Sequence, residues 1–230
     1  MNIIVTIILM YIIISFLEWY IHKYLMHYTD NKLVNIFNYG FKKLYSIIHS
    51  FNQDKSHEDH HIIVNNDGYV NMKDDGMFMS INNTPLIGIF GFLIYYLISK
   101  ALKFKHNKNE YKIIFIIFLI ISCIYYLLWN ILHPSYHNYN GSKNDLIKNN
   151  FIYEYLEKYH MIHHFNKGKD KCNYNIILPG ADFLFGTYKG CVDNIDFCKN
   201  NISKTEKEIE LCEKEINNIK LRTNIDYCNK

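Results

Sequence analysis

The stretch YKIIFIIFLIISCIYYLLWNIL, residues 111–132, is apolar on every side and carries no charge after Lys112. A helix that spans a membrane needs roughly 20 consecutive, mostly apolar residues. A run of this length that is apolar all round has no place on the surface of a small soluble domain. The stretch therefore predicts a transmembrane helix and, with it, an integral membrane protein.

Two further apolar blocks, residues 2–20 and 84–104, have shorter charge-free cores and end in side chains such as Trp19 and Lys100, which anchor helices at a membrane interface. The polar link KHNKNE, residues 105–110, joins the second and third blocks as a helical hairpin. The predicted fold class is all-α: an integral membrane helical domain of about three spans, with a cytosolic histidine-rich helical cap and a C-terminal helix.

Three spans place residue 1 and the hairpin link on one side of the membrane, and residues 21–83 and 133–230 on the other. The link region is rich in lysine, which the positive-inside rule favours on the cytoplasmic face. A hairpin that dips into the membrane without crossing it would also keep residues 21–83 and 133–230 together. Whether the first two blocks cross fully is open at this point.

Overall composition excludes some classes of protein. The 230 residues carry a formal net charge of +3 with a single arginine, Arg222, which is too balanced for a nucleic-acid-binding surface. The six cysteines form no CxxC pair, which predicts reduced thiols that bind no metal. No basic segment follows Met1 and no small-residue cleavage site follows the first apolar block, so we expect no cleavable signal peptide.

The character of the chain changes after residue 192. We predict a histidine-rich membrane domain over residues 1–192 and a charged helical tail over 193–230. Residues 201–224 place apolar side chains at alternating steps of three and four, which predicts a helix that packs on its own domain or forms a short coiled coil with a partner helix. Residues 31–51 alternate apolar and basic positions, as in a helix that lies on the membrane interface.

Ten of the twelve histidines fall into four clusters, and only His49 and His106 lie outside them. The clustered residues are His22 and His27 (H-x4-H), His57, His60 and His61 (HxxHH), His133 and His137 (H-x3-H), and His160, His163 and His164 (HxxHH). On a helix, HxxHH presents three ring nitrogens to one point. Burying imidazoles without partners is unfavourable, so this pattern predicts bound metal.

The spacing and number of these histidines indicate two metal ions. Ten ligands exceed what one ion of coordination four to six can use, and imidazole suits Fe, Zn, Cu and Ni alike. His22 and His27 are five residues apart, which requires either two different metals or a distorted helix end. Pro134 predicts that a new helix begins between His133 and His137.

The position of the clusters favours a redox centre. A transporter would carry ligands inside its spans, where this sequence shows no histidine. A structural zinc site would use four ligands, with cysteine among them, and a soluble di-iron bundle would use glutamates. A metal pair at the mouth of a lipid-embedded bundle suits oxidation of an apolar substrate. The carboxylates expected to accept hydrogen bonds from the ligands are those of Glu18, Asp59, Glu157 and Asp182.

The chain resembles the membrane-bound fatty acid hydroxylase superfamily, which includes fatty acid hydroxylases, sterol desaturases and carotenoid hydroxylases. The resemblance covers roughly residues 1–190 and rests on five motifs: EWYIHKYLMH (18–27), HEDHH (57–61), NILHPSYH (130–137), HMIHH (160–164) and NYNIILPGADFLFGTY (173–188). Many members have four spans, whereas this chain shows three. The resemblance implies a helical domain at the endoplasmic reticulum with its histidine site facing the cytosol.

The same resemblance implies that all ten clustered histidines bind two Fe ions, with Zn able to replace them in purified protein. O2 would be a co-substrate, and a separate haem carrier or reductase would supply electrons. The expected function is an oxygen-dependent di-iron oxidoreductase that hydroxylates a fatty acyl, sphingolipid or sterol C–H bond. Desaturation of a lipid, a non-catalytic membrane metal-binding protein and a relative with a purely structural role are the alternatives. No catalytic residue is assigned beyond the metal ligands.

Overall fold

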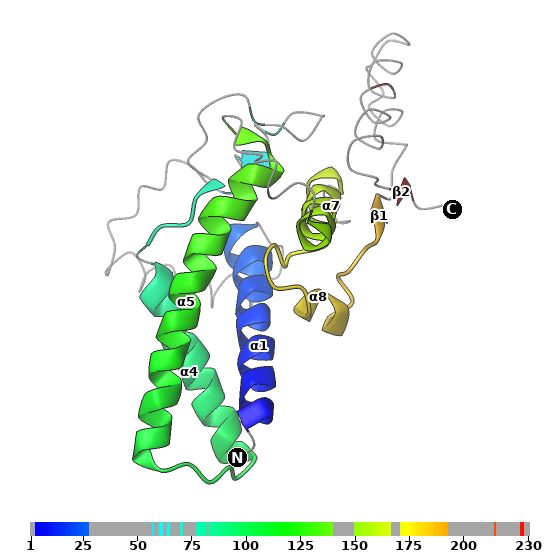
Figure 1. Ribbon diagram of the computed structural model, residues 1–230. Coiled ribbons are helices and arrows are strands. Elements are labelled where there is room, and N and C mark those ends of the chain that lie inside the picture. The colour runs from blue at the N-terminus through cyan, green and yellow to red at the C-terminus, as the bar shows by residue number, and fades with distance from the viewer. Residues whose placement is uncertain are drawn as a thin grey trace.

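A computed structural model describes residues 3–27, 57, 60, 61, 64, 70, 77–81, 83–139, 150–166, 171–192, 214, 226 and 227. The elements, shown in Figure 1, are α1 (Ile3–Tyr20), the π-helix η1 (Ile21–Met26), α4 (Asn83–Ala101), α5 (Lys108–Tyr136), α7 (Phe151–Phe165), α8 (Ala181–Leu184), β1 (Cys191–Val192) and β2 (Asp226–Tyr227). The predicted all-α class is confirmed. β1 and β2 are a two-residue parallel pairing that adds no layer.

Three helices are long and apolar enough to cross a membrane, as predicted: Ile3–Tyr24, Asn83–Ala101 and Lys108–Tyr136. In Figure 1 the start of α1 lies beside the link between α4 and α5, and both α1 and α5 lead from there to the opposite end. We call the first the link end and the second the histidine end, because His22 and His133 lie there. These histidines occupy the last turns of two of the three helices, just beyond the predicted apolar blocks 2–20 and 111–132.

The α4–α5 hairpin is closely packed because glycine allows the two helices to approach. A Cβ atom at Gly91 would lie 2.8 Å from the Phe118 ring and 3.3 Å from the Ile14 side chain. These contacts show that Ile14, Gly91 and Phe118 lie at the same level along the three helices.

The hairpin link ends in a capping box at the start of α5, where the Asn107 side chain accepts from the Glu110 N–H and the Glu110 carboxylate accepts from the Asn107 N–H.

The opposite face of α5 is a continuous apolar surface. Its large exposed side chains are Ile113, Ile116, Ile117, Ile120, Ile124, Leu127 and Ile131. This row runs from residue 113 to residue 131, which is roughly 27 Å of helix and close to the thickness of a bilayer's hydrocarbon core. Such a face is stable in contact with lipid, and it marks the part of α5 that could lie at membrane depth.

Two predictions require correction. α5 does not begin anew at Pro134 but continues through it to Tyr136. Pro134 lies in the last turn, where a proline removes only one hydrogen bond before the helix ends. Cys191 takes part in a disulfide, so the thiols are not all reduced, while Cys123 and Cys172 form no disulfide.

Several predictions concern residues outside the described part of the chain. The interfacial helix over 31–51 lies there entirely. So does the tail helix over 201–224, apart from Lys214, which is helical. The division into residues 1–192 and 193–230 stays a prediction.

Candidate metal centre

The structure brings all ten clustered histidines together in two groups that could each hold a metal ion. The first group is His22, His27, His57, His61 and His163. The second group is His60, His133, His137, His160 and His164. In each group one ring nitrogen per residue lies within 4.8 Å of all the others. His106 belongs to neither group, and its Nε2 lies 3.0 Å from the Tyr95 hydroxyl instead.

A π-helix brings His22 and His27 into the same group. The His27 N–H donates to the His22 carbonyl at 3.2 Å, which is the five-residue step of a π-helix. The two rings therefore stack, with centroids 4.9 Å apart and planes inclined by 27°. Of the two explanations for the five-residue spacing, the distorted helix end is confirmed, and the separation of these residues between two metals is wrong.

The helical spacing predicted that each HxxHH motif presents three ring nitrogens to one point, and this prediction is wrong. On α7, His160 and His164 belong to the second group, whereas His163 belongs to the first. Adjacent helical residues differ by about 100° in direction, so His163 and His164 point to different centres. In the other motif, His57 and His61 belong to the first group and His60 to the second.

The two groups are neighbours because each HxxHH motif contributes to both. The rings of His61 in the first group and His164 in the second stack at a centroid distance of 4.1 Å. His160 and His163 also stack, at 5.9 Å. The two groups therefore form a paired centre, in which imidazole rings of one group stack on rings of the other.

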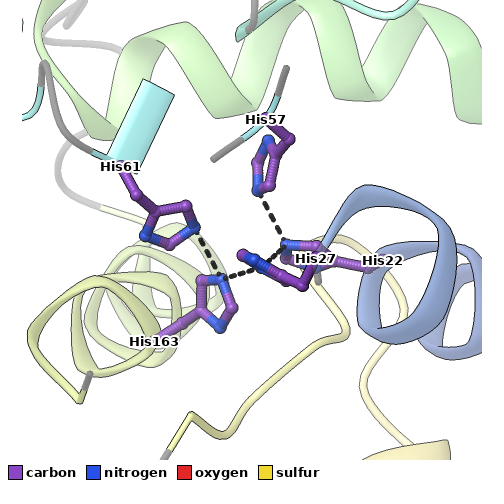
Figure 2. A group of neighbouring side chains, drawn as sticks. All are labelled: His22, His27, His57, His61 and His163. Carbon is purple, nitrogen blue, oxygen red and sulfur yellow. Dashed lines mark hydrogen bonds between the residues drawn. The ribbon is translucent and has the colours of Figure 1, made fainter. Parts of the chain in front are cut away.

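Within the first group the Nε2 atoms converge, as Figure 2 shows. His22 Nε2 lies 2.9 Å from His57 Nε2 and 3.2 Å from His27 Nε2, and His163 Nε2 lies 3.1 Å from those of His27 and His61. Two nitrogens that bind one ion at a right angle, with bonds of about 2.1 Å, lie roughly 3.0 Å apart. The spacing of the five atoms therefore fits one metal ion with several nitrogen ligands.

The second group has the same spacing. His137 Nε2 lies 2.9 Å from His160 Nε2 and 3.2 Å from His60 Nε2, and His160 Nε2 lies 3.0 Å from His164 Nε2. Each group is thus suited to one ion.

Backbone carbonyls fix the protonation of three rings. The Nδ1 atom lies 2.6 Å from the Tyr174 oxygen in His22, 2.6 Å from the Cys172 oxygen in His163, and 2.8 Å from the Met77 oxygen in His133. A carbonyl oxygen only accepts, so Nδ1 carries the proton and the Nε2 lone pair is free to bind a metal. No sequence signal marks these partners, because a carbonyl is present in every residue.

Two of the predicted carboxylates, those of Glu18 and Asp182, do not bond to the histidine rings but to the chain segment whose carbonyls do. Glu18 accepts hydrogen bonds from the Ile176, Ile177 and Leu178 N–H groups at 2.8 to 3.0 Å. Asp182 accepts from the Tyr174 and Asn175 N–H groups, the Thr187 hydroxyl and the Tyr159 hydroxyl. Both carboxylates hold the segment that carries the Cys172 and Tyr174 carbonyls and thereby support His22 and His163 indirectly.

The other two predicted carboxylates are those of Glu157 and Asp59. Glu157 is buried on α7, and Asp59 lies outside the described residues.

Burial keeps five of these imidazoles neutral. Burial, followed by the neighbouring imidazoles, holds the pKa values of His57, His61, His160 and His164 well below the ordinary value of 6.5. The pKa of His163 is lowered by burial and by His27, against the opposing hydrogen bond to Cys172. Neutral imidazole is the form that binds metal ions.

These shifts predict a loss of stability in mild acid for the metal-free protein. Below about pH 6.5 the unfolded chain binds protons at these histidines and the folded chain does not, so the free energy of unfolding falls as the pH falls. Each such histidine lowers it by up to about 1.4 kcal/mol per pH unit in this range. The thermal unfolding midpoint in detergent with a chelator should drop below about pH 6.5. A midpoint that is constant across this range would contradict the buried, neutral cluster.

A narrow apolar cavity reaches the first group from between the long helices. It is lined by Ile14, Glu18, Ile21, His22, Met26, Met79, Ile87, Tyr125 and Trp129. Its internal free volume is about 20 Å³, which is room for about one water molecule. Its lining is almost entirely hydrophobic, so a group entering beside His22 meets apolar side chains.

Comparison of the chain with protein-family models, curated proteins and solved structures gave no match. The histidine clusters and the three apolar helices are compatible with a membrane protein of the histidine-box type. In the part of the chain that is described, this is therefore a helical protein with three helices that could span a membrane and two histidine groups that could bind metal ions.

Proposed function

We propose that this protein is an oxygen-dependent di-iron oxidoreductase of the membrane that hydroxylates a lipid C–H bond. One observation supports this most strongly: two adjoining groups of five histidines lie at the histidine end of three apolar helices. Four of the five motifs that resemble the membrane-bound fatty acid hydroxylase superfamily supply all ten of these side chains. The ten histidines are proposed as the metal ligands.

The candidate ligand atoms, all imidazole nitrogens, favour a redox-active metal over a structural ion. Among the described residues, neither group contains a cysteine or a carboxylate. A structural zinc site is closed by four ligands and usually includes thiolates. Ferrous iron accepts imidazole, and bound iron would supply the activation of O2 that no side chain provides.

The reaction proposed balances as follows. One atom of O2 enters the substrate C–H bond to form an alcohol, and the other leaves as water, with two electrons and two protons from a separate donor. A haem carrier or reductase is the proposed donor. The histidine end would face the cytosol, at the endoplasmic reticulum, where such a carrier can reach it.

The protein's own residues hold and shield the centre. The carbonyls of Tyr174, Cys172 and Met77 orient three of the rings. Burial of His22, His60 and His160 excludes water from the reacting atoms. The cavity beside His22 is proposed as the place where a lipid chain approaches, after side chains such as Met26 and Met79 move apart.

The test is to express the protein with iron in a eukaryotic host, supply isotopically heavy O2 and analyse the membrane lipids. We expect one heavy oxygen atom in a lipid alcohol, absent when His160→Ala replaces the wild type. Loss of two hydrogens without added oxygen would assign desaturation, in which O2 becomes two waters. Two bound metal ions without any change in lipids would favour the metal-binding alternative.

A further inference from the structure

Residues 173–189 form a closed loop, which we call the closing loop. Its neck is held by Asn173, whose side chain accepts from the Lys189 N–H at 2.8 Å and donates to the Lys189 carbonyl at 2.9 Å. Its tip is Pro179, Gly180 and the short helix α8. Figure 1 shows α8 beside the middle of α1, away from the histidine end.

Direct hydrogen bonds place this tip along α1. The Ser15 hydroxyl donates to the Leu178 carbonyl at 2.8 Å and accepts from the Ala181 N–H at 3.0 Å. One turn nearer the link end, the Tyr11 hydroxyl donates to the Pro179 carbonyl. The tip is thus level with Tyr11 and Ser15.

These two residues lie deep within the apolar helix Ile3–Tyr24. Ser15 is nine residues from Tyr24, or roughly 13 Å along the helix axis. Tyr11 is thirteen residues from Tyr24, or roughly 20 Å. A hydrocarbon core is about 30 Å thick, so both positions lie near its middle if this helix crosses the membrane over its whole apolar length, with Tyr24 rather than Trp19 at the boundary.

α5 gives the same depth independently. Tyr125 of α5 donates to the Glu18 carboxylate at 3.1 Å, and Glu18 in turn holds the loop at Ile176 and Leu178. The lipid-facing row of α5 continues six residues beyond Tyr125 to Ile131, or roughly 9 Å nearer the histidine end. The segment of the closing loop that Glu18 holds, residues 176–178, therefore also lies at the depth of the lipid-facing row of α5.

Most of the backbone N–H groups of the loop have a hydrogen-bond partner. Non-helical backbone at membrane depth is tolerated only where protein groups satisfy its polar atoms. The Glu18 carboxylate accepts hydrogen bonds from the three N–H groups of residues 176–178, and the Ser15 hydroxyl accepts from the Ala181 N–H. The Asp182 carboxylate accepts from the N–H groups of residues 174 and 175. The Asn175 side chain completes the contact by donating to the Ser15 carbonyl at 2.8 Å.

The tip nevertheless exposes large apolar side chains. Phe183, Leu184 and Phe185 are 54%, 69% and 50% exposed. Ile8 and Ile12 of α1, near the level of Tyr11, are also exposed. In water this would be an unfavourable apolar surface, whereas at this depth it continues the lipid-facing surface of the helices.

We propose that the closing loop is a re-entrant membrane segment, which enters the bilayer from the histidine end, turns near the middle and returns. Phe183, Leu184 and Phe185 contact lipid acyl chains. The protein is then embedded by three helices and by a loop whose other residues, Tyr174 among them, hold the metal-site histidines. This inference rests on the apolar helices crossing a membrane and is independent of the proposed reaction.

The depth can be measured with an added tryptophan as a fluorescent reporter. Leu184→Trp adds a third tryptophan to Trp19 and Trp129, both of which are buried. The full chain is reconstituted in vesicles of phospholipid brominated near the end of the acyl chain, and iodide is added as the aqueous quencher. We expect the added fluorescence to be quenched by bromine to the same fraction as in Ile120→Trp, and to be unaffected by iodide.

Matched variants make the outcome decisive. Ile120→Trp, on the lipid face of α5, is the deep control, and Lys105→Trp, in the hairpin link, is the aqueous control. Phe183→Trp repeats the measurement if Leu184→Trp fails to fold. Quenching by iodide, or only by lipids brominated near the headgroup, would place the loop at or outside the interface and overturn the proposal. Quenching by neither would mean that protein, such as a second copy of the chain, covers the tip, which would also overturn it.

Discussion

Replacing His163 with alanine is expected to remove metal from the first group and to abolish lipid oxidation. His163 Nε2 stands between two other donors, 3.1 Å from His27 Nε2 and 3.1 Å from His61 Nε2. Loss of a group that merely orients a ligand lowers metal affinity by about 10- to 100-fold, so loss of a donor should exceed about 100-fold. His60→Ala should have the same effect on the second group, where its Nε2 lies 3.2 Å from that of His137.

The measurement is metal stoichiometry of detergent-purified protein together with lipid analysis. The wild type should bind two equivalents, and each variant should lose at least one. His106→Ala is the matched control, because this histidine contacts Tyr95 at the link end and should leave both metals in place. His49→Ala is also expected to be tolerated. Equal metal loss in all four variants, or a wild type that binds none, would refute the assignment.

The parts of this architecture that sequence predicts well are those that depend on local pattern. The apolar stretch 111–132 needs no partner to identify it, since length and the absence of charge decide its place in a membrane. The five-residue interval between His22 and His27 carried its own signal, because only a distorted helix end brings both rings to one face. The π-helix η1 supplies that distortion.

The allocation of histidines between the two groups could not be predicted in this way. His160, His163 and His164 share one side of α7, but which centre each ring meets depends on where α1 and α5 end in space. Helical periodicity gives directions within one element only. The pairing of His57 with His22, at 2.9 Å, joins segments far apart in the chain and has no sequence signature.

Glu18 shows why a correct candidate received the wrong role. It lies one turn before His22, which favours a direct contact between the two side chains. The closing loop competes for the same carboxylate with consecutive N–H groups that have no helix or sheet partner. Burying those donors unpaired would cost more than leaving His22 to a backbone carbonyl, so the loop takes Glu18 and offers the Tyr174 oxygen to His22.

Replacing Glu18 with alanine should therefore have the largest effect on stability of any single change outside the metal ligands. The substitution leaves the Ile176, Ile177 and Leu178 N–H groups and the Tyr125 hydroxyl without an acceptor at a buried site. Each unsatisfied donor costs about 1–3 kcal/mol, so the free energy of unfolding should fall by at least about 3 kcal/mol.

The same change should also release metal, although Glu18 touches none of the ring nitrogens in the site. When the closing loop loosens, the Tyr174 and Cys172 carbonyls no longer hold the Nδ1 atoms of His22 and His163. Thermal unfolding in detergent and metal content measure the two effects on one sample. Glu154→Ala is the matched control, because Glu154 is exposed in the first turn of α7 and its loss should cost at most about 1 kcal/mol. If Glu18→Ala keeps both its unfolding midpoint and its metal, the loop does not support the centre, and the carbonyl contacts alone would have to account for the order of His22 and His163.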